Sequence, residues 1–175
     1  MRKFLGHLNT VMCHRRKVFY HCLKVGIPVR GLLHDLSKYS PTEFFPGVRF
    51  FTGTRSPNEG ERAEVGYSAA WMHHKGRNRH HFEFWTDYNP VTKSLAPVKM
   101  PIVFVKEMFC DRVAASKVYQ GKNYTDEYPH KYFEAGKVRR MIHPETADLL
   151  EEWLIMLKDH GEEETFRHIK SVKKY

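Results

Sequence analysis

LLHDLSK, residues 32–38, places two side chains of the kind that bind metals, His34 and Asp35, next to each other in a largely apolar stretch. A buried imidazole and a buried carboxylate each need a polar partner. A divalent cation supplies that partner to both while holding them side by side. This stretch therefore predicts a metal centre, and the helices that carry its further ligands would determine the fold.

One further ligand is expected from the helix predicted over residues 5–25. His14 stands there between two valines at helical spacing, so its side chain should point toward the core. His7 lies seven residues earlier, near the same face, and remains an alternative to His14. A core histidine bonded to a backbone carbonyl would explain either residue alone, but it would not explain the nearby His34-Asp35 pair.

Asp111 is a second expected ligand, from the long helix predicted over residues 101–121. It occupies the middle of a stripe of apolar residues that repeat at intervals of four and three. An unpaired carboxylate on such a face is strongly unfavourable. Arg112 is adjacent in sequence but points about 100° away around the helix. Asp111 should therefore meet a histidine, a metal or an arginine from another segment.

The stretch WMHHKGRNRHH, residues 71–81, contains four histidines among three cationic side chains. Its two His-His pairs, across a tight turn, could bring several imidazoles together. The alternative is a basic surface loop, because histidine and arginine are common on solvated faces. The aromatic residues that flank the stretch favour burial of at least one side.

Helical periodicity dominates the rest of the chain, and no segment shows the alternation of a strand. We therefore expect an all-α protein, a single domain over residues 1–175 folded as a compact bundle of about six to eight helices without a significant sheet. Beyond the two helices above, helices are expected over residues 28–39, from Glu43 onward, over 61–75, 78–88 and 144–160, with a loop or lid at 52–60 and a connector at 89–100.

Composition limits the classes of partner. The formal net charge of +9, from 29 Lys and Arg against 20 Asp and Glu, favours anionic partners such as nucleotides, other phosphate esters or nucleic acid. The three cysteines show no CxxC spacing and are expected to be reduced thiols. Neither a signal peptide nor an apolar stretch long enough to cross a membrane is recognisable. A cytoplasmic protein is the expectation.

These residues resemble the HD superfamily of metal-dependent phosphohydrolases, whose ligands follow the order His, His-Asp and a distant Asp on helices. His14, His34-Asp35 and Asp111 match that order. More closely, the chain resembles a small HD-like family of bacteria and their phages that carries a domain of unknown function. That resemblance rests on GLLHDLSKYSPTEF at 31–44, AWMHHKGRNRHH at 70–81 and EMFCDRVAASK at 107–117.

The resemblance implies an HD-like helical fold and roles for particular residues. His34-Asp35-Leu36-Ser37-Lys38 is similar to the HDxxK form of the motif, which implies that Lys38 contacts phosphate. Binuclear HD proteins place second-metal ligands between the doublet and the last aspartate, with the doublet aspartate bridging. This implies a second site drawn from His73, His74, His80 and His81. The GYP signature of cyclic-dinucleotide phosphodiesterases is absent, so that specificity is not implied.

The leading hypothesis is a metal-dependent phosphohydrolase that acts on a nucleotide or a related phosphate ester. The metal, one or two ions of Mn, Fe, Zn, Co or Ni, would activate a water molecule that Asp35 orients. Lys38 would neutralise charge on the phosphoryl group. Further phosphate contacts are expected from Lys75 and Arg77, with Arg112 and Lys117 weaker candidates for the same role.

Two alternatives remain open. The same ligands could hold two irons that activate dioxygen, as in some HD-like oxygenases, because imidazole and carboxylate suit iron equally well. The chain could instead be a non-catalytic basic protein that binds nucleic acid or a host protein, although its cationic residues are dispersed and no nucleic-acid motif is recognisable. Homo-oligomers are compatible with all three hypotheses. A phage-encoded chain would act in the host cytoplasm.

Overall fold

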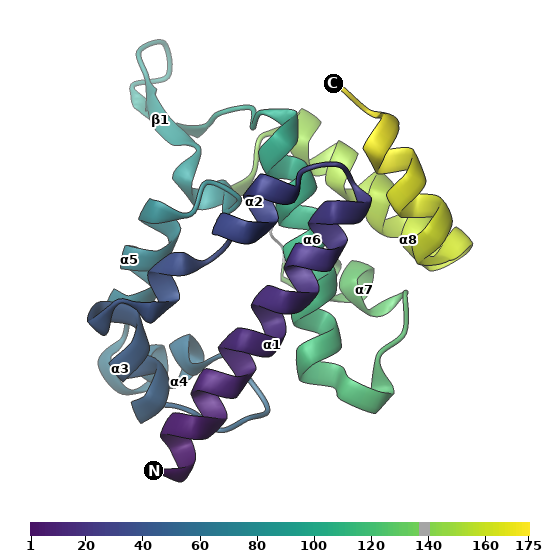
Figure 1. The fold of residues 1–175 in the computed structure, drawn as a ribbon. Helices are drawn as coiled ribbons and strands as arrows, with labels where there is room; N and C mark the ends of the chain where they lie inside the picture. The colour runs from purple at the N-terminus through teal and green to yellow at the C-terminus, as the bar shows by residue number, and fades with distance from the viewer. Residues whose placement is uncertain (137–140) are drawn as a thin grey trace.

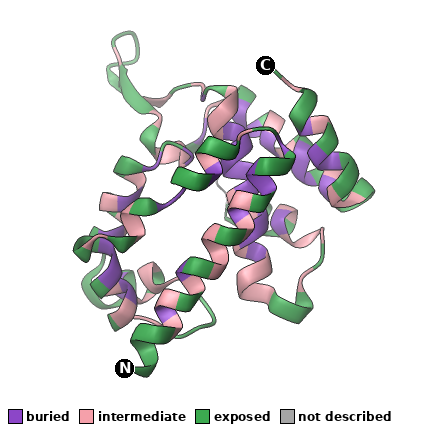
Figure 2. Cartoon of the chain, viewed as in Figure 1, coloured by how far each residue is buried: buried purple, intermediate pink, exposed green. Residues whose placement is uncertain are grey.

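Three helices, α1 (Arg2–Lys24), α6 (Ile102–Gln120) and α8 (Pro144–Ser171), meet to form the hydrophobic core of the protein. The computed structural model describes residues 1–136 and 141–175. Buried residues gather where these helices meet (Figures 1 and 2). The fully buried apolar side chains at this junction include Val18 and Cys22 of α1, Val105, Phe109 and Val113 of α6, and Leu150, Trp153, Leu154 and Leu157 of α8.

Glycines end two of the predicted helices at the expected positions. Gly26, with a φ of 80°, follows α1, and Pro28 then starts α2 (Pro28–Leu33). Gly121, with a φ of 53°, follows α6. Both residues adopt a backbone conformation that other residues reach only at a cost. The predicted ends of these two helices are confirmed.

The helix predicted over residues 28–39 is wrong in one respect, because it is broken at His34-Asp35. The segment consists of α2 and the short 3-10 helix η1 (Leu36–Tyr39), and between them Asp35 adopts a left-handed conformation with a φ of 54°. The side chain of Arg15 fixes this break, donating from Nε to the His34 carbonyl (2.8 Å) and from Nη2 to the Leu32 carbonyl (3.0 Å). Tertiary contacts therefore override local helical periodicity here.

The opposite side of the molecule is built from α3 (Pro41–Arg49), α4 (Pro57–Val65) and α5 (Ala69–Arg77), with α3 in contact with both others (Figure 1). The predicted loop at 52–60 is partly wrong, because α4 begins within it. The predicted helix over 61–75 is also interrupted, since Gly66 has a φ of 83° and ends α4. Ser68 then caps α5 by accepting a hydrogen bond from the Trp71 amide.

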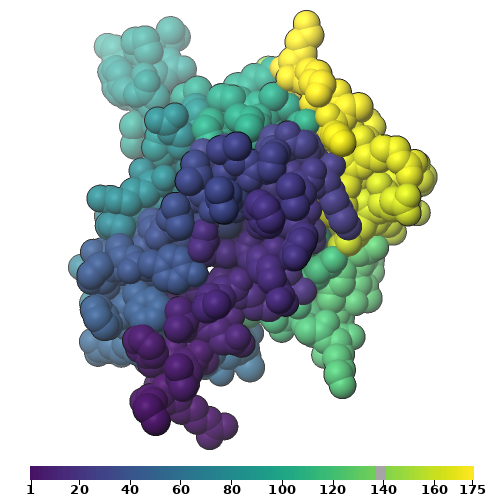
Figure 3. All heavy atoms as spheres, in the orientation of Figure 1, coloured from purple at the N-terminus to yellow at the C-terminus, as the bar shows by residue number. Residues whose placement is uncertain are grey.

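The helix predicted over residues 78–88 is wrong. The 3-10 turn η2 (Phe82–Phe84) is followed by a two-stranded antiparallel hairpin, β1 (Thr86–Asn89) and β2 (Ser94–Pro97), which lies partly in the predicted connector. The side-chain oxygen of Asn89 accepts from two backbone amides in the turn, which stabilises the reversal. The hairpin projects away from the helices (Figure 3).

Two features near the C-terminus differ from expectation. Helix α7 (Tyr128–Ala135) was not predicted, and it packs against α8. The helix predicted over residues 144–160 does stop at Gly161, whose φ of 76° and ψ of 178° are not helical, and a second helical segment that was not predicted follows the kink and runs to Ser171. Buried Thr165, Phe166 and Ile169 hold this second segment of α8 against the protein.

The expectation of a mainly helical protein is confirmed. In residues 1–136 and 141–175, the structure contains eight α-helices, and its sheet is limited to the small hairpin. No helix in the described part of the chain combines the length and apolar character needed to cross a membrane.

Candidate metal centre

A cavity of about 460 Å³ lies between the helices of the core and those of the opposite side. Its size falls in the range of small-molecule binding sites. The wall combines ligand-type side chains with cations and aromatic rings. Those with metal-binding atoms in or next to the expected motifs are His14, Asp35, His74, His81 and Asp111. The cavity therefore reaches the side chains that the sequence predicts to bind metal.

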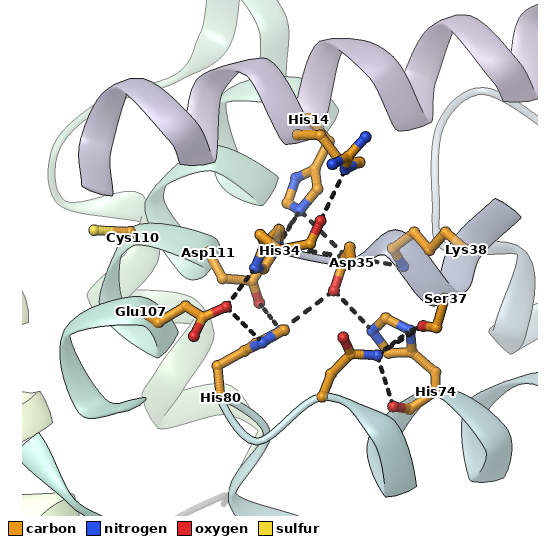
Figure 4. Close-up of polar contacts among 12 residues, drawn as sticks. His14, His34, Asp35, Ser37, Lys38, His74, His80, Glu107, Cys110 and Asp111 are labelled. Carbon is orange, nitrogen blue, oxygen red and sulfur yellow. Dashed lines mark hydrogen bonds and ion pairs between the residues drawn. The ribbon is translucent and has the colours of Figure 1, made fainter. Parts of the chain in front are cut away.

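The first group of converging atoms comes from His14, His34, Asp35 and Asp111, whose ligand atoms all lie within 4.8 Å of one another. His14 Nε2 is 3.0 Å from Asp111 Oδ1 and 3.4 Å from His34 Nε2 (Figure 4). His34 Nε2 is 3.4 Å from Asp35 Oδ2. Ligands at about 2.0–2.2 Å from a metal lie roughly 3–3.5 Å apart. The spacing therefore fits a single ion.

The second group comes from Asp35, His74, His80 and His81, again within 4.8 Å of one another. Asp35 Oδ1 is 3.3 Å from His74 Nε2 and 3.5 Å from His80 Nε2. Since Asp35 Oδ2 faces the first group, its two oxygens face different groups (Figure 4). We refer to the seven residues of both groups, His14, His34, Asp35, His74, His80, His81 and Asp111, as the ligand cluster.

Buried atoms without hydrogen-bond partners support this assignment. Asp35 Oδ1, His80 Nε2 and His81 Nε2 are all buried and lack one. Such atoms are rare in native proteins, because leaving them unpaired is costly. A cation among them would satisfy all three. The donor types, imidazole nitrogen and carboxylate oxygen, suit Mn, Fe, Co, Ni and Zn. The residues of the first group and those of the second group could therefore each hold one metal ion.

The protonation states of His74, His81 and Asp35 suit ligation. Burial and the positive charge of Lys38 lower the pKa of His74, and burial together with His80 lowers the pKa of His81 well below its usual value. Both are then neutral at pH 7, the form that binds metals. Burial would raise the pKa of Asp35, but the neighbouring His34 and Lys38 hold it well below its usual range. The Asp35 carboxylate is therefore ionised.

Lys38 completes the charged edge of the cavity. Its Nζ lies 3.4 Å from Asp35 Oδ2. Burial would lower the pKa of Lys38, but the carboxylates of Asp35 and Asp111 outweigh burial and raise it. The side chain therefore stays cationic next to the first ligand group, where a phosphate oxygen could reach it.

Two buried carboxylates, those of Glu107 and Glu43, contact the Nδ1 atoms of histidines in the ligand cluster. Glu107 is fully buried, and its Oε1 is 3.1 Å from His34 Nδ1 and 3.2 Å from His80 Nδ1. Sequence reasoning missed this residue, although its position four residues before Asp111 places it on the same helix face. Glu43 contacts His74 Nδ1 through Oε2 at 2.7 Å. Because these contacts use Nδ1, they leave Nε2 facing the ligand groups.

His73 and His7 lie apart from both groups. His73 Nδ1 contacts the other Glu43 oxygen at 2.6 Å, so the structure separates it from the three histidines with which the sequence groups it. His7 lines the cavity but does not belong to either group, whereas His14 does. The close approach of Gly47 to the His7 ring leaves no room for a side chain there.

Of the four cationic residues expected to contact phosphate besides Lys38, the structure brings only some to the cavity. Arg112 lines the cavity, and its buried Nε has no hydrogen-bond partner. Lys75 and Arg77, near the end of α5, are absent from the described cavity lining. Lys117 forms an ion pair with Glu162 of α8. Of the four, Arg112 is the one that the structure brings to the cavity.

Comparison with known proteins gives one match. The model of a family described as a family of unknown function (DUF5662) matches residues 3–156. No curated protein and no solved structure matches the chain.

Proposed function

The chain belongs to the DUF5662 family, a family of unknown function, and we propose that its activity is metal-dependent hydrolysis of a nucleotide or a related phosphate ester. One observation carries the proposal: two groups of metal-binding side chains share Asp35 at the edge of a cavity of about 460 Å³, with Lys38 beside them. A binuclear centre next to a half-buried cation is suited to phosphoryl chemistry.

The order of the ligands supports membership of the HD superfamily. His14 lies on α1, the His34-Asp35 pair at the break between α2 and η1, and Asp111 on α6. The first metal would be held by these four residues, and the second by Asp35 with His74, His80 and His81. When bound, such metals lower the pKa of water and polarise phosphoryl oxygens.

The side chains of the protein supply the remaining functions. Lys38 Nζ donates to a phosphoryl oxygen and neutralises the negative charge that grows there during the reaction. Arg112, with its unpartnered buried Nε, contacts a more distant part of the substrate. The aromatic residues of the cavity wall, among them Trp71 and Tyr119, exclude water and pack against the organic part of the substrate. The expected partner is therefore a small anionic molecule.

The test begins with metal content. We compare the wild-type protein with Asp35→Asn, which removes the shared charge while tolerating the left-handed backbone, and with Asp87→Asn on the exposed hairpin as the matched control. Mass spectrometry of protein purified without chelators should find metal in wild type and Asp87→Asn and little in Asp35→Asn. Phosphate release from a panel of nucleotides with Mn²⁺ should follow the same pattern. Full metal content in Asp35→Asn would contradict the proposed site.

A second candidate, oxygen activation by two irons, is favoured by the sharing of Asp35 between two ligand groups. Lys38 argues for the hydrolase, because dioxygen needs no cationic side chain, whereas a phosphate group does. Visible absorbance after loading with Fe²⁺ in air, together with oxygen consumption, would identify the oxygenase. Phosphate release without oxygen uptake would support the hydrolase.

A further inference from the structure

Glu107 lies outside the ligand cluster but contacts a histidine from each of its two groups. Its Oε1 lies 3.1 Å from His34 Nδ1 and 3.2 Å from His80 Nδ1 (Figure 4). We propose that Glu107 is a shared positioning residue, which sets the orientation and tautomer of His34 and His80 together and thereby makes both metal subsites depend on one carboxylate. This inference rests on the metal centre of the proposed function.

The tautomer follows from the chemistry of the carboxylate. An ionised carboxylate only accepts hydrogen bonds, so the nitrogen facing it must carry the proton. The other oxygen of Glu107, Oε2, accepts a hydrogen bond from Arg30 Nε at 2.7 Å, a contact that suits an ionised carboxylate. With Nδ1 protonated, Nε2 is the nitrogen left to bind metal. His34 Nε2 faces Asp35 Oδ2 at 3.4 Å, and His80 Nε2 faces Asp35 Oδ1 at 3.5 Å.

The two histidines are also in direct contact. Their rings pack with centroids 4.3 Å apart at an angle of 37°. A rotation of either ring would therefore displace the other. The His34 contact satisfies the geometry of a hydrogen bond, whereas His80 Nδ1 is less well aligned. We therefore expect Glu107 to contribute more to the first subsite than to the second.

Arg30 holds Glu107 in place. Its Nε donates to Glu107 Oε2 at 2.7 Å, and its guanidinium lies 4.7 Å from the centre of the Phe104 ring. Arginine has donors only. A glutamine at position 107 would thus direct its amide nitrogen at Arg30, or at the Nδ1–H groups of the histidines. Either orientation sets donors against donors, so Glu107→Gln should disturb both rings without changing the size of the side chain.

Glu43 provides the matched control. Its Oε2 contacts His74 Nδ1 at 2.7 Å, and its other oxygen contacts His73, which lies outside both ligand groups. Glu43 is buried like Glu107 but supports a histidine of the second group alone. Glu43→Gln should therefore affect one subsite, whereas Glu107→Gln should affect two.

The experiment is a titration of metal-free protein with Co²⁺, followed by visible absorption, with Zn²⁺ competition to resolve the two dissociation constants. Loss of a positioning partner typically weakens metal binding by about 10–100-fold. We expect Glu107→Gln to weaken both equivalents, the first more strongly, and Glu43→Gln to weaken one. In Zn²⁺-loaded protein, long-range ¹H–¹⁵N spectra should show altered Nδ1–H signals for His34 and His80 in Glu107→Gln only.

Thermal unfolding of the metal-free variants separates positioning from folding. If Glu107→Gln does not fold, Arg30→Gln leaves the carboxylate in place but removes its anchor, and it should weaken both equivalents by a smaller factor. Two unchanged dissociation constants in a folded Glu107→Gln protein, or a change in only one, would overturn the inference while leaving the hydrolase proposal intact. Conversely, both equivalents weakened in Glu107→Gln of a protein that releases no phosphate would support the inference and contradict the hydrolase.

Discussion

The apolar core and the ligand cluster use the same helices, α1 and α6, but they are stabilised in opposite ways. In the core, side chains such as Val18 and Phe109 are fully buried against other apolar groups. In the ligand cluster, His14 and Asp111 from the same two helices face each other at 3.0 Å. Packing holds the first region whatever the solution contains, whereas the second brings together the carboxylates of Asp35 and Asp111, whose negative charge an ion would neutralise. The core should thus determine stability, and the cluster metal binding.

The largest change in the free energy of unfolding is expected from removing a large side chain from the apolar core. Trp153 is fully buried and packs edge-to-face with Phe109 at 6.1 Å between ring centres. Trp153→Ala should lower the free energy of unfolding by about 3–5 kcal/mol, because it leaves a cavity in a close-packed region. Denaturant unfolding of metal-free protein measures this. The control is Ile155→Ala, at a 39% exposed position of the same helix. This change should cost about 1 kcal/mol or less. Similar losses of stability in the two variants would contradict the dominant role of the buried core.

The apolar core also surrounds a titratable side chain, His21, which should make the free energy of unfolding depend on pH. Burial chiefly lowers the pKa of His21 to about 4, despite the hydrogen bond to the Cys110 carbonyl. The unfolded chain takes up this proton near pH 6.5, but the folded protein does so only near pH 4. Stability should therefore be complete above pH 6.5 and fall as the pH decreases to about 4, by about 3 kcal/mol from this group.

The check is His21→Asn, which keeps a donor for the Cys110 carbonyl but cannot titrate. The difference in unfolding free energy between wild type and variant, measured from pH 7.5 to pH 4, should change by roughly this 3 kcal/mol. A difference that stays constant over the range would show that His21 does not contribute.

Metal removal tests the ligand cluster in turn. At a free metal concentration of about 100 times the dissociation constant, binding to the folded state adds about 2.7 kcal/mol of stability. A chelator should therefore lower the melting temperature of wild type and leave Asp35→Asn unchanged. A chelator effect of equal size in Asp35→Asn would place the stabilising ion elsewhere.

The smallest effect is expected at the junction of the two regions. Arg15 holds the break at His34-Asp35 by donating to two backbone carbonyls. Lysine can replace only part of this forked contact, so Arg15→Lys should cost about 1 kcal/mol of stability and weaken metal binding. The neighbouring exposed position offers the control Arg16→Lys. Equal metal affinity in the two variants would show that the break needs no support from Arg15.

Local patterns in the sequence predicted the helices best where a single chemical signal dominates. Gly26 and Gly121 mark the ends of α1 and α6, and the stripe around Asp111 indicated a long helix with a buried carboxylate. Prediction failed where the signals are mixed. Residues 78–88 contain aromatic and charged side chains without a decisive period, and they form a turn and a strand. The hairpin depends on pairing between strands, which periodicity within one segment does not show.

The sequence by itself determined that the protein is mainly helical and that His34 and Asp35 stand side by side, because helical periodicity and adjacency are local properties of a chain. Only the tertiary structure decided which histidines converge: His74, His80 and His81 join Asp35, while His73 turns to Glu43. The tertiary structure also brought Glu107 behind two of them. Such choices depend on how α5, α6 and the loop after α5 pack together, and contacts between distant segments leave no periodic signal in the sequence.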